Sequence, residues 1–195
     1  MPESAAPSKF AKKLASTAQG QFDQFHLIDE NDPPLSGQIK KYWTTLGLDF
    51  PGVEEPWSAV FVSFCVKTAG ASAAEFKFAA AHSVFVHKAI QNASRGTGVF
   101  RGVKITDQPV AVGDIVQNNR QGNDFDFNFA KANTDYKSHS AIVISVGEDA
   151  RGKFAFTIGG NESDSIRMKR VTLNPDGTIK QRSTSSYICL VKNLK

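Results

Sequence analysis

The chain has 195 residues, of which 41% are hydrophobic, so it can bury one sizeable core, and its length favours a single domain. Its 23 lysines and arginines exceed its 19 aspartates and glutamates, but both signs are spread along the chain, so we expect only a mild attraction to anionic partners. Because the sequence has no basic block and no motif for binding RNA or DNA, we expect no nucleic-acid partner.

The cysteines and the apolar runs favour a soluble protein without disulfides. Cys65 and Cys189 each lie inside an apolar run and are expected to be buried thiols. No run of about 18 apolar residues occurs, and residues 1–16 have three lysines but no apolar signal core. We therefore expect no transmembrane segment, and a protein that is cytoplasmic as made and exported, if at all, without an ordinary signal peptide.

The first half of the chain has helical periodicity. Residues 1–8, rich in Pro, Ser and Ala, are expected to form a flexible arm, and residues 9–195 a single domain. Apolar residues recur at helical spacing over residues 10–26 and again over residues 35–47. This pattern predicts two amphipathic helices, with a proline-containing break between them.

Residues 56–69 form the most apolar stretch of the sequence. Apolar side chains fall on almost every face of the helix predicted there, so it should be buried on most sides. Pro56 suits the first turn and Gly70 can end the helix. Ser58 then lies at the mouth of a buried helix. A further helix is predicted over residues 82–93.

The second half of the chain has the alternation and β-branched runs of strands. Helices followed by antiparallel strands predict an α+β fold. Residues 118–137, which carry Phe125, Phe127 and Phe129, are expected to be irregular and to form either a packed loop or a lid over a cleft. The strands are predicted over residues 99–103, 114–117, 140–146, 154–158, 166–173 and 187–191.

A predicted hairpin brings a histidine next to a polar residue. If residues 140–146 pair with residues 154–158, positions that sum to about 300 or 301 face each other. His139 then lies opposite Asn161 or Glu162 and gains a partner that holds its ring, as a catalytic base requires. The choice between the two partners depends on a one-residue difference in register, which the sequence leaves open.

Four motifs, in their order along the chain, resemble those of the papain-like CHAP and NlpC-type cell-wall amidases. They are more similar still to an uncharacterised bacterial family of that superfamily with the same Trp-Ser-Ala opening. The likeness covers roughly residues 35–192. The motifs are Pro56-Trp57-Ser58-Ala59-Val60-Phe61-Val62, Gly113-Asp114-Ile115-Val116, Ser138-His139-Ser140-Ala141-Ile142-Val143-Ile144 and Ile158-Gly159-Gly160-Asn161.

The resemblance implies a papain-like amidase fold and a set of site residues. By position, Ser58 would be the nucleophile, His139 the general base and Asn161 the residue that orients His139. The amidases have Cys where this chain has Ser58, and a hydroxyl, unlike a thiol, stays protonated at a helix N-terminus, so a histidine must take its proton. Cys65 cannot replace it, because seven residues place it about 10 Å further along the helix.

Each of these residues also has a structural interpretation. Ser58 can be a helix-capping hydroxyl, and His139 a buried histidine bonded to the backbone. Trp57, His82 and Glu162 are expected to bind substrate, although Trp57 also suits the core and His82 a structural role at the start of a helix. No ligand spacing for a metal is present, and we expect no metal and no cofactor.

Together these features predict a hydrolase of amide or ester bonds, with a Ser58, His139 and Asn161 site and bacterial peptidoglycan as its favoured substrate. Such a protein would be a lysin or an effector, and an effector can have an inhibitor or immunity protein as partner. Two alternatives remain open. One is a non-catalytic module that binds cell wall or a partner protein, and the other is a lipid acyl hydrolase that uses residues 118–137 as an apolar lid.

Overall fold

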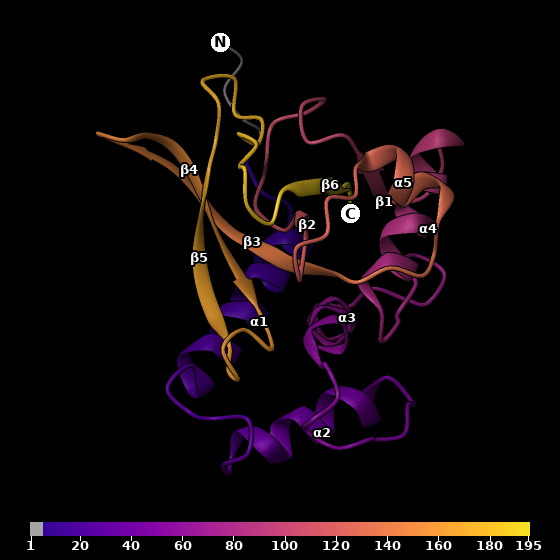
Figure 1. The fold of residues 1–195 in the computed structure, drawn as a ribbon, viewed down its shortest axis with the longest axis vertical. Coiled ribbons are helices and arrows are strands. Elements are labelled where there is room, and N and C mark those ends of the chain that lie inside the picture. The colour runs from indigo at the N-terminus through magenta and orange to yellow at the C-terminus, as the bar shows by residue number, and fades with distance from the viewer. Residues whose placement is uncertain (1–5) are drawn as a thin grey trace.

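The computed structural model describes residues 6–195, which form five helices and a six-stranded antiparallel sheet (Figure 1). The predicted α+β class is therefore confirmed. The helices are α1 (Lys9–Phe25), α2 (Leu35–Thr45), α3 (Ser58–Ala69), α4 (His82–Ser94) and α5 (Phe127–Ala132). The strands are β1 (Phe100–Val103), β2 (Ile115–Asn119), β3 (Ser138–Asp149), β4 (Gly152–Gly159), β5 (Arg167–Thr172) and β6 (Tyr187–Asn193).

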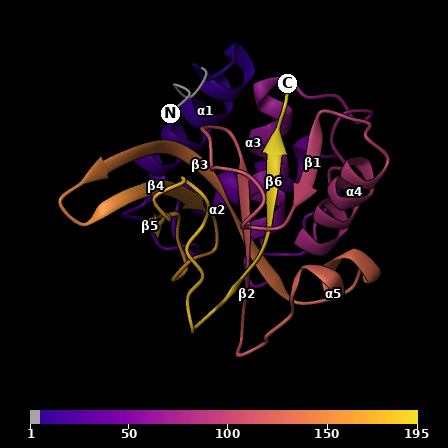
Figure 2. The same cartoon turned by 90° about the horizontal axis from the view of Figure 1, so that it is seen from above.

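The sheet has the strand order β1-β6-β2-β3-β4-β5, and every pair of neighbours is antiparallel. The hairpin of β3 and β4 extends away from the body of the molecule, with β5 beside it (Figure 2). Helices α1, α3 and α4 pack against the sheet. Because β3 and β4 lie next to each other in the middle and outer part of the sheet, the start of β3 and the end of β4 come together near the helices.

Apolar side chains are buried on both faces of the sheet. Ile142 of β3 packs in the main core with the helices, and the next residue, Val143, packs in a second core on the other face. This alternation follows from the pleat of a strand. The second core is closed by side chains from connecting segments, among them Ile105 and Ile179.

Helix α3 is buried along most of its length, as its apolar sequence predicts. It begins at Ser58, and Trp57 is its N-cap, so Pro56 lies before the helix rather than in its first turn. Gly70 ends the helix in the left-handed conformation, with φ of 109°, which a glycine adopts without steric cost. Ser58 is therefore the first residue of a buried helix.

The N-terminal segment is attached to the fold at Ser8. Its hydroxyl caps α1 by accepting from the Ala11 N–H at 3.0 Å, and it donates to the Lys195 carbonyl. Of the flexible arm predicted over residues 1–8, residues 1–5 lie outside the described part of the chain. No helix of residues 6–195 is long and apolar enough to cross a membrane.

The segment 118–137 is not wholly irregular, because it contains the short helix α5. Asp126 caps α5, its carboxylate accepting from the Phe129 N–H at 2.7 Å. Phe125 stacks on Phe129 with ring centroids 4.1 Å apart, and α5 packs against α4. A helix of six residues is too short to show a periodicity, which is why the sequence pattern did not reveal it.

Candidate active site

Two helices begin at the candidate site, and the first residue of each contacts the other. The Ser58 hydroxyl lies 2.7 Å from His82 Nε2, with Ser58 at the start of α3 and His82 at the start of α4. Both residues are buried, with relative exposures of 2% for Ser58 and 6% for His82. Neither helix is capped by a side chain from residues 6–195, so backbone N–H groups and the positive ends of two helix dipoles are directed at this point.

His82 is held in its neutral form. Its burial lowers the pKa of the ring well below the usual value, and the charges of His139 and Arg120 lower it further. A neutral ring leaves one nitrogen free to accept a proton, so His82 Nε2 can accept the hydrogen bond of Ser58. The other ring nitrogen, Nδ1, is buried and has no hydrogen-bond partner within the described residues.

A second pair, His139 and Glu162, lies next to the first. His139 Nε2 is 2.7 Å from Glu162 Oε1, and the other carboxylate oxygen of Glu162 forms an ion pair with Lys169. Burial alone would raise the pKa of Glu162, but His139 and Lys169 outweigh it and lower the pKa, so the carboxylate is ionised. The rings of His139 and His82 meet edge to face with centroids 5.4 Å apart.

Glu162, rather than Asn161, is the residue that contacts His139. Strands β3 and β4 pair in both of the registers that the sequence allowed. Ile142 faces Ile158, so the paired residue numbers add up to 300, and after a bulge further along the hairpin they add up to 301. Strand β4 ends at Gly159, and Asn161 follows in the left-handed conformation with φ of 54°. The chain leaves the ladder there, so Asn161 turns away and Glu162 returns to His139. The prediction that Asn161 orients His139 is therefore wrong.

Asn161 instead forms part of a contact centred on Glu30. The Asn161 amide and the Trp57 indole N–H both donate to Glu30 Oε2, each at 2.8 Å. Trp57 is fully buried in the main core, which fits the structural role that its sequence position also allowed, and its indole N–H is directed at Glu30. Glu30 lies in the break between the first two helices and is 131 positions from Asn161. No local motif marked it, because only the fold brings these residues together.

Two glycines at the end of β4 make room for the site. A Cβ on Gly159 would overlap Glu162 Oε1 and lie 2.7 Å from His139 Nε2. A Cβ on Gly160 would lie 2.5 Å from Trp57 Cζ3 and 2.7 Å from the ring of Phe61. Gly159 therefore leaves room for the His139–Glu162 hydrogen bond, and Gly160 for the packing of α3.

A cavity of about 360 Å³ adjoins the second pair. His139, Asn161 and Glu162 contribute to its lining, whereas Ser58 and His82 do not. The hydrogen bond of Ser58 goes to His82, so the expected pairing of Ser58 with His139 is replaced by a row in which His82 contacts both residues. The predicted site residues therefore lie close together, but in a different order of contacts.

The fold and site define an α+β domain in which a buried Ser–His pair at two helix N-termini contacts a His–carboxylate pair on the sheet. The chain belongs to a bacterial family: the model described as "Uncharacterized protein conserved in bacteria (DUF2272)" matches residues 28–190. The match to an uncharacterised bacterial family was expected from the sequence. The matched range begins just before Glu30 and includes every residue of the two pairs. No curated protein and no solved structure matches the chain.

Proposed function

We propose that the protein is a hydrolase of amide or ester bonds in which Ser58 is the nucleophile and His82 its general base. The observation that carries the proposal is the 2.7 Å contact between the Ser58 hydroxyl and His82 Nε2 at the uncapped start of α3. A neutral histidine within hydrogen-bond distance is what a serine hydroxyl needs to become a nucleophile. This assigns the base to His82, where the sequence pointed to His139.

The reaction would proceed in two steps. Ser58 Oγ attacks the carbonyl carbon while its proton passes to His82 Nε2, and His82 then gives that proton to the leaving amine or alcohol. Water, deprotonated by the same ring, releases the acyl group and restores the Ser58 hydroxyl. The backbone N–H groups at the start of α3 are placed to bind the oxyanion. The carboxylate of Glu162, bonded to His139, offsets the positive charge that His82 gains.

Peptidoglycan is the substrate class we favour, and the resemblance to papain-like amidases supports it. A serine at a helix start, a histidine at the start of a strand and a polar residue after the next strand occur in the expected order. The lipid alternative has less support. The cavity next to His139 is lined mainly by polar and charged side chains, so it offers little surface to an acyl chain, and Phe125 and Phe129 pack on each other.

A non-catalytic binding module is the second candidate, and one observation favours it. Ser58 is almost fully buried, and the cavity reaches His139 and Glu162 but neither member of the Ser58–His82 pair. A substrate carbonyl therefore contacts Ser58 only after the side chains that cover it move. In a binding module the cavity alone would act, and the Ser58–His82 pair would serve to hold α3 and α4 together.

The test compares turnover in matched variants. Purified protein is incubated with peptidoglycan and with short-chain esters, and the released fragments are measured by mass spectrometry. We expect Ser58→Ala and His82→Gln to lower turnover by at least 10²-fold, the usual contribution of a general base. Ser63→Ala is the control, because Ser63 is another buried hydroxyl of α3, bonded to the Ala79 carbonyl, and should keep activity once folded.

The outcome separates the two candidates. Circular dichroism and urea unfolding confirm that each variant is folded before its rate is compared. Equal turnover in Ser58→Ala and the parent would contradict the catalytic proposal. Absence of turnover in the parent, together with retention on insoluble peptidoglycan, would instead support the binding module.

A further inference from the structure

The cavity beside His139 is strongly cationic. Four basic side chains contribute to its lining, Arg120, Lys169, Arg170 and Arg182, against the single carboxylate of Glu162. Its volume of about 360 Å³ is in the range of small-ligand sites. A concave surface with an excess of one charge attracts ligands of the opposite charge, so the partners of these four cations decide what the cavity can bind.

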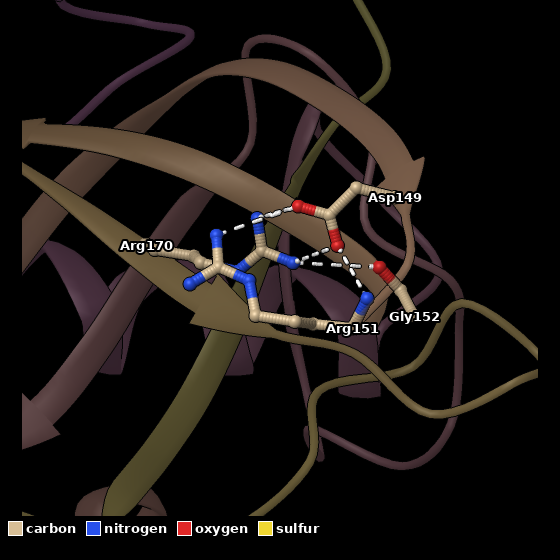
Figure 3. Close-up of polar contacts among 4 residues, drawn as sticks. All are labelled: Asp149, Arg151, Gly152 and Arg170. Carbon is tan, nitrogen blue, oxygen red and sulfur yellow. Dashed lines mark hydrogen bonds and ion pairs between the residues drawn. The ribbon is translucent and has the colours of Figure 1, made fainter.

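Two of the four cations are already paired. Lys169 forms an ion pair with Glu162. The Arg170 guanidinium donates to both oxygens of Asp149, at 2.9 and 3.0 Å, and packs 3.9 Å from the centre of the Phe154 ring. Figure 3 shows this guanidinium directed at the Asp149 carboxylate, beside Arg151 and the Gly152 carbonyl. Because a carboxylate already pairs with each of these two cations, they attract an anionic ligand less strongly than unpaired cations would.

The other two cations have no acidic partner among residues 6–195. Within residues 6–195 the guanidinium of Arg120 makes no hydrogen bond and no ion pair. The Arg182 guanidinium lies 4.4 Å from the centre of the Tyr187 ring, and among the described residues it donates only its Nε–H, to the Ser185 carbonyl. Its two terminal nitrogens, Nη1 and Nη2, make no hydrogen bond and no ion pair within the described chain. An arginine fork with both terminal nitrogens available suits a carboxylate or phosphate.

Two adjacent segments of the chain bring these two arginines to the cavity. Arg120 directly follows β2, and Arg182 lies in the segment that leads into β6. Asn119 joins the two segments: its backbone N–H donates to the Ser186 carbonyl at 2.8 Å and its side chain donates to the Ser186 hydroxyl at 3.0 Å. His139 contributes to the lining of the same cavity, and its ring lies 5.4 Å from the ring of His82, so the cavity adjoins the proposed base through His139.

We infer that Arg120 and Arg182 form a subsite for an oxyanion, a carboxylate or a phosphate, carried by the substrate beside the bond that Ser58 attacks. As a statement about the substrate this rests on the proposed hydrolase. As a statement about binding it does not, because it depends only on the cavity and on two guanidinium groups that form no ion pair within the described part of the chain. A hydrolase with this subsite would act on acidic peptides or on phosphorylated glycans in preference to neutral ones.

The test measures binding in the Ser58→Ala protein, which has no nucleophile. Glutarate is titrated as the carboxylate probe and inorganic phosphate as the phosphate probe, at constant ionic strength set by sodium chloride, and followed by calorimetry and by the NMR signals of the histidine rings. We expect saturable binding that shifts the His139 ring but not His87, whose ring contacts the Ala130 carbonyl. Tighter binding of one probe identifies the kind of oxyanion.

Substitution of the arginines decides the outcome. We expect Arg120→Gln and Arg182→Gln each to weaken binding about tenfold, since each removes a charge-assisted contact. Arg120→Lys, which keeps the charge but loses the fork, should have an intermediate effect. Arg95→Gln, an exposed change at the end of α4, is the control. Absence of saturable binding of both probes, or equal affinity in parent and Arg120→Gln, would overturn the subsite. Neither result depends on whether Ser58 is catalytic.

Discussion

The ring of His82 is buried beside Ser58, and burial sets its protonation state. A buried ring that loses its hydration resists protonation, which is why its pKa lies well below the usual value. Neutral His82 is competent as a base at pH 7 and should stay so in mildly acidic solution. The same burial that limits access to Ser58 therefore keeps its base unprotonated.

The lowered pKa of His82 predicts a pH dependence of stability. The unfolded chain takes up a proton on this ring near pH 6.5, whereas the folded protein does so only at lower pH. The contribution of neutral His82 to the free energy of unfolding is thus fully present above about pH 6.5. It is lost as the pH falls toward the pKa of His82 in the folded protein, with a slope of up to about 1.4 kcal/mol per pH unit. Urea unfolding at pH 7.5 and 5.5 measures this loss.

His82→Gln is the matched variant, because glutamine can keep a hydrogen bond to Ser58 without titrating. Between pH 7.5 and pH 5.5, the free energy of unfolding of His82→Gln should fall by about 1 kcal/mol less than that of the parent. The lowered pKa of Glu162 does not interfere, since that contribution is lost only below its usual value near 4.5. Identical pH slopes in the two proteins would show that His82 is not the buried neutral group described above.

At the scale of elements, the two glycines at the end of β4 have different neighbours, so one affects the geometry of the site and the other the stability of the fold. Gly159 borders the His139–Glu162 hydrogen bond, and Gly160 borders Trp57 and Phe61 of the main core. Neither glycine has a positive φ, so alanine is compatible with the backbone at both positions. The two substitutions should therefore act through what their methyl groups contact.

Gly160→Ala should destabilise the fold by about 1–3 kcal/mol, the cost of overpacking a well-filled core. Gly159→Ala should cost less, because side-chain ends can move, but it should displace Glu162 from His139. Urea unfolding measures the first effect, and the NMR chemical shifts of the His139 ring, which depend on its contact with Glu162, measure the second. His139 ring signals in Gly159→Ala identical to those of the parent would contradict this assignment.

Elements with a clear hydrophobic periodicity could be predicted from the sequence, whereas the short helix α5 and the turn after β4 could not. Helix α3 and the pairing of β3 with β4 follow from apolar pattern and strand alternation. Helix α5 was missed because one capping residue, Asp126, was its main signal. The partner of His139 was missed because the left-handed conformation of Asn161, just beyond the ladder, decides which side chain turns back.

At the scale of the whole molecule, the site is assembled from five separate segments. Glu30 comes from the connection after α1, Ser58 and His82 from two helix starts, His139 from β3 and Glu162 from the turn after β4. Sequence order could name Ser58, His82, His139 and Glu162 as candidates, since each lies at the boundary of a predictable element. It could not predict that His82 takes the hydrogen bond of Ser58, because this depends on how α3 and α4 pack.

The rate of alkylation of Ser58→Cys by iodoacetamide tests most directly whether this arrangement activates residue 58. Transfer of the thiol proton to His82 Nε2 would give a thiolate–imidazolium pair at the α3 helix start, so the pH profile should show an apparent pKa below about 8.5. Cys65 is the internal reference, because burial raises the pKa of its thiol. We predict that Cys at position 58 reacts faster than Cys65, and that adding His82→Gln slows it. Reaction no faster than that of Cys65, or unchanged by His82→Gln, would contradict the central claim.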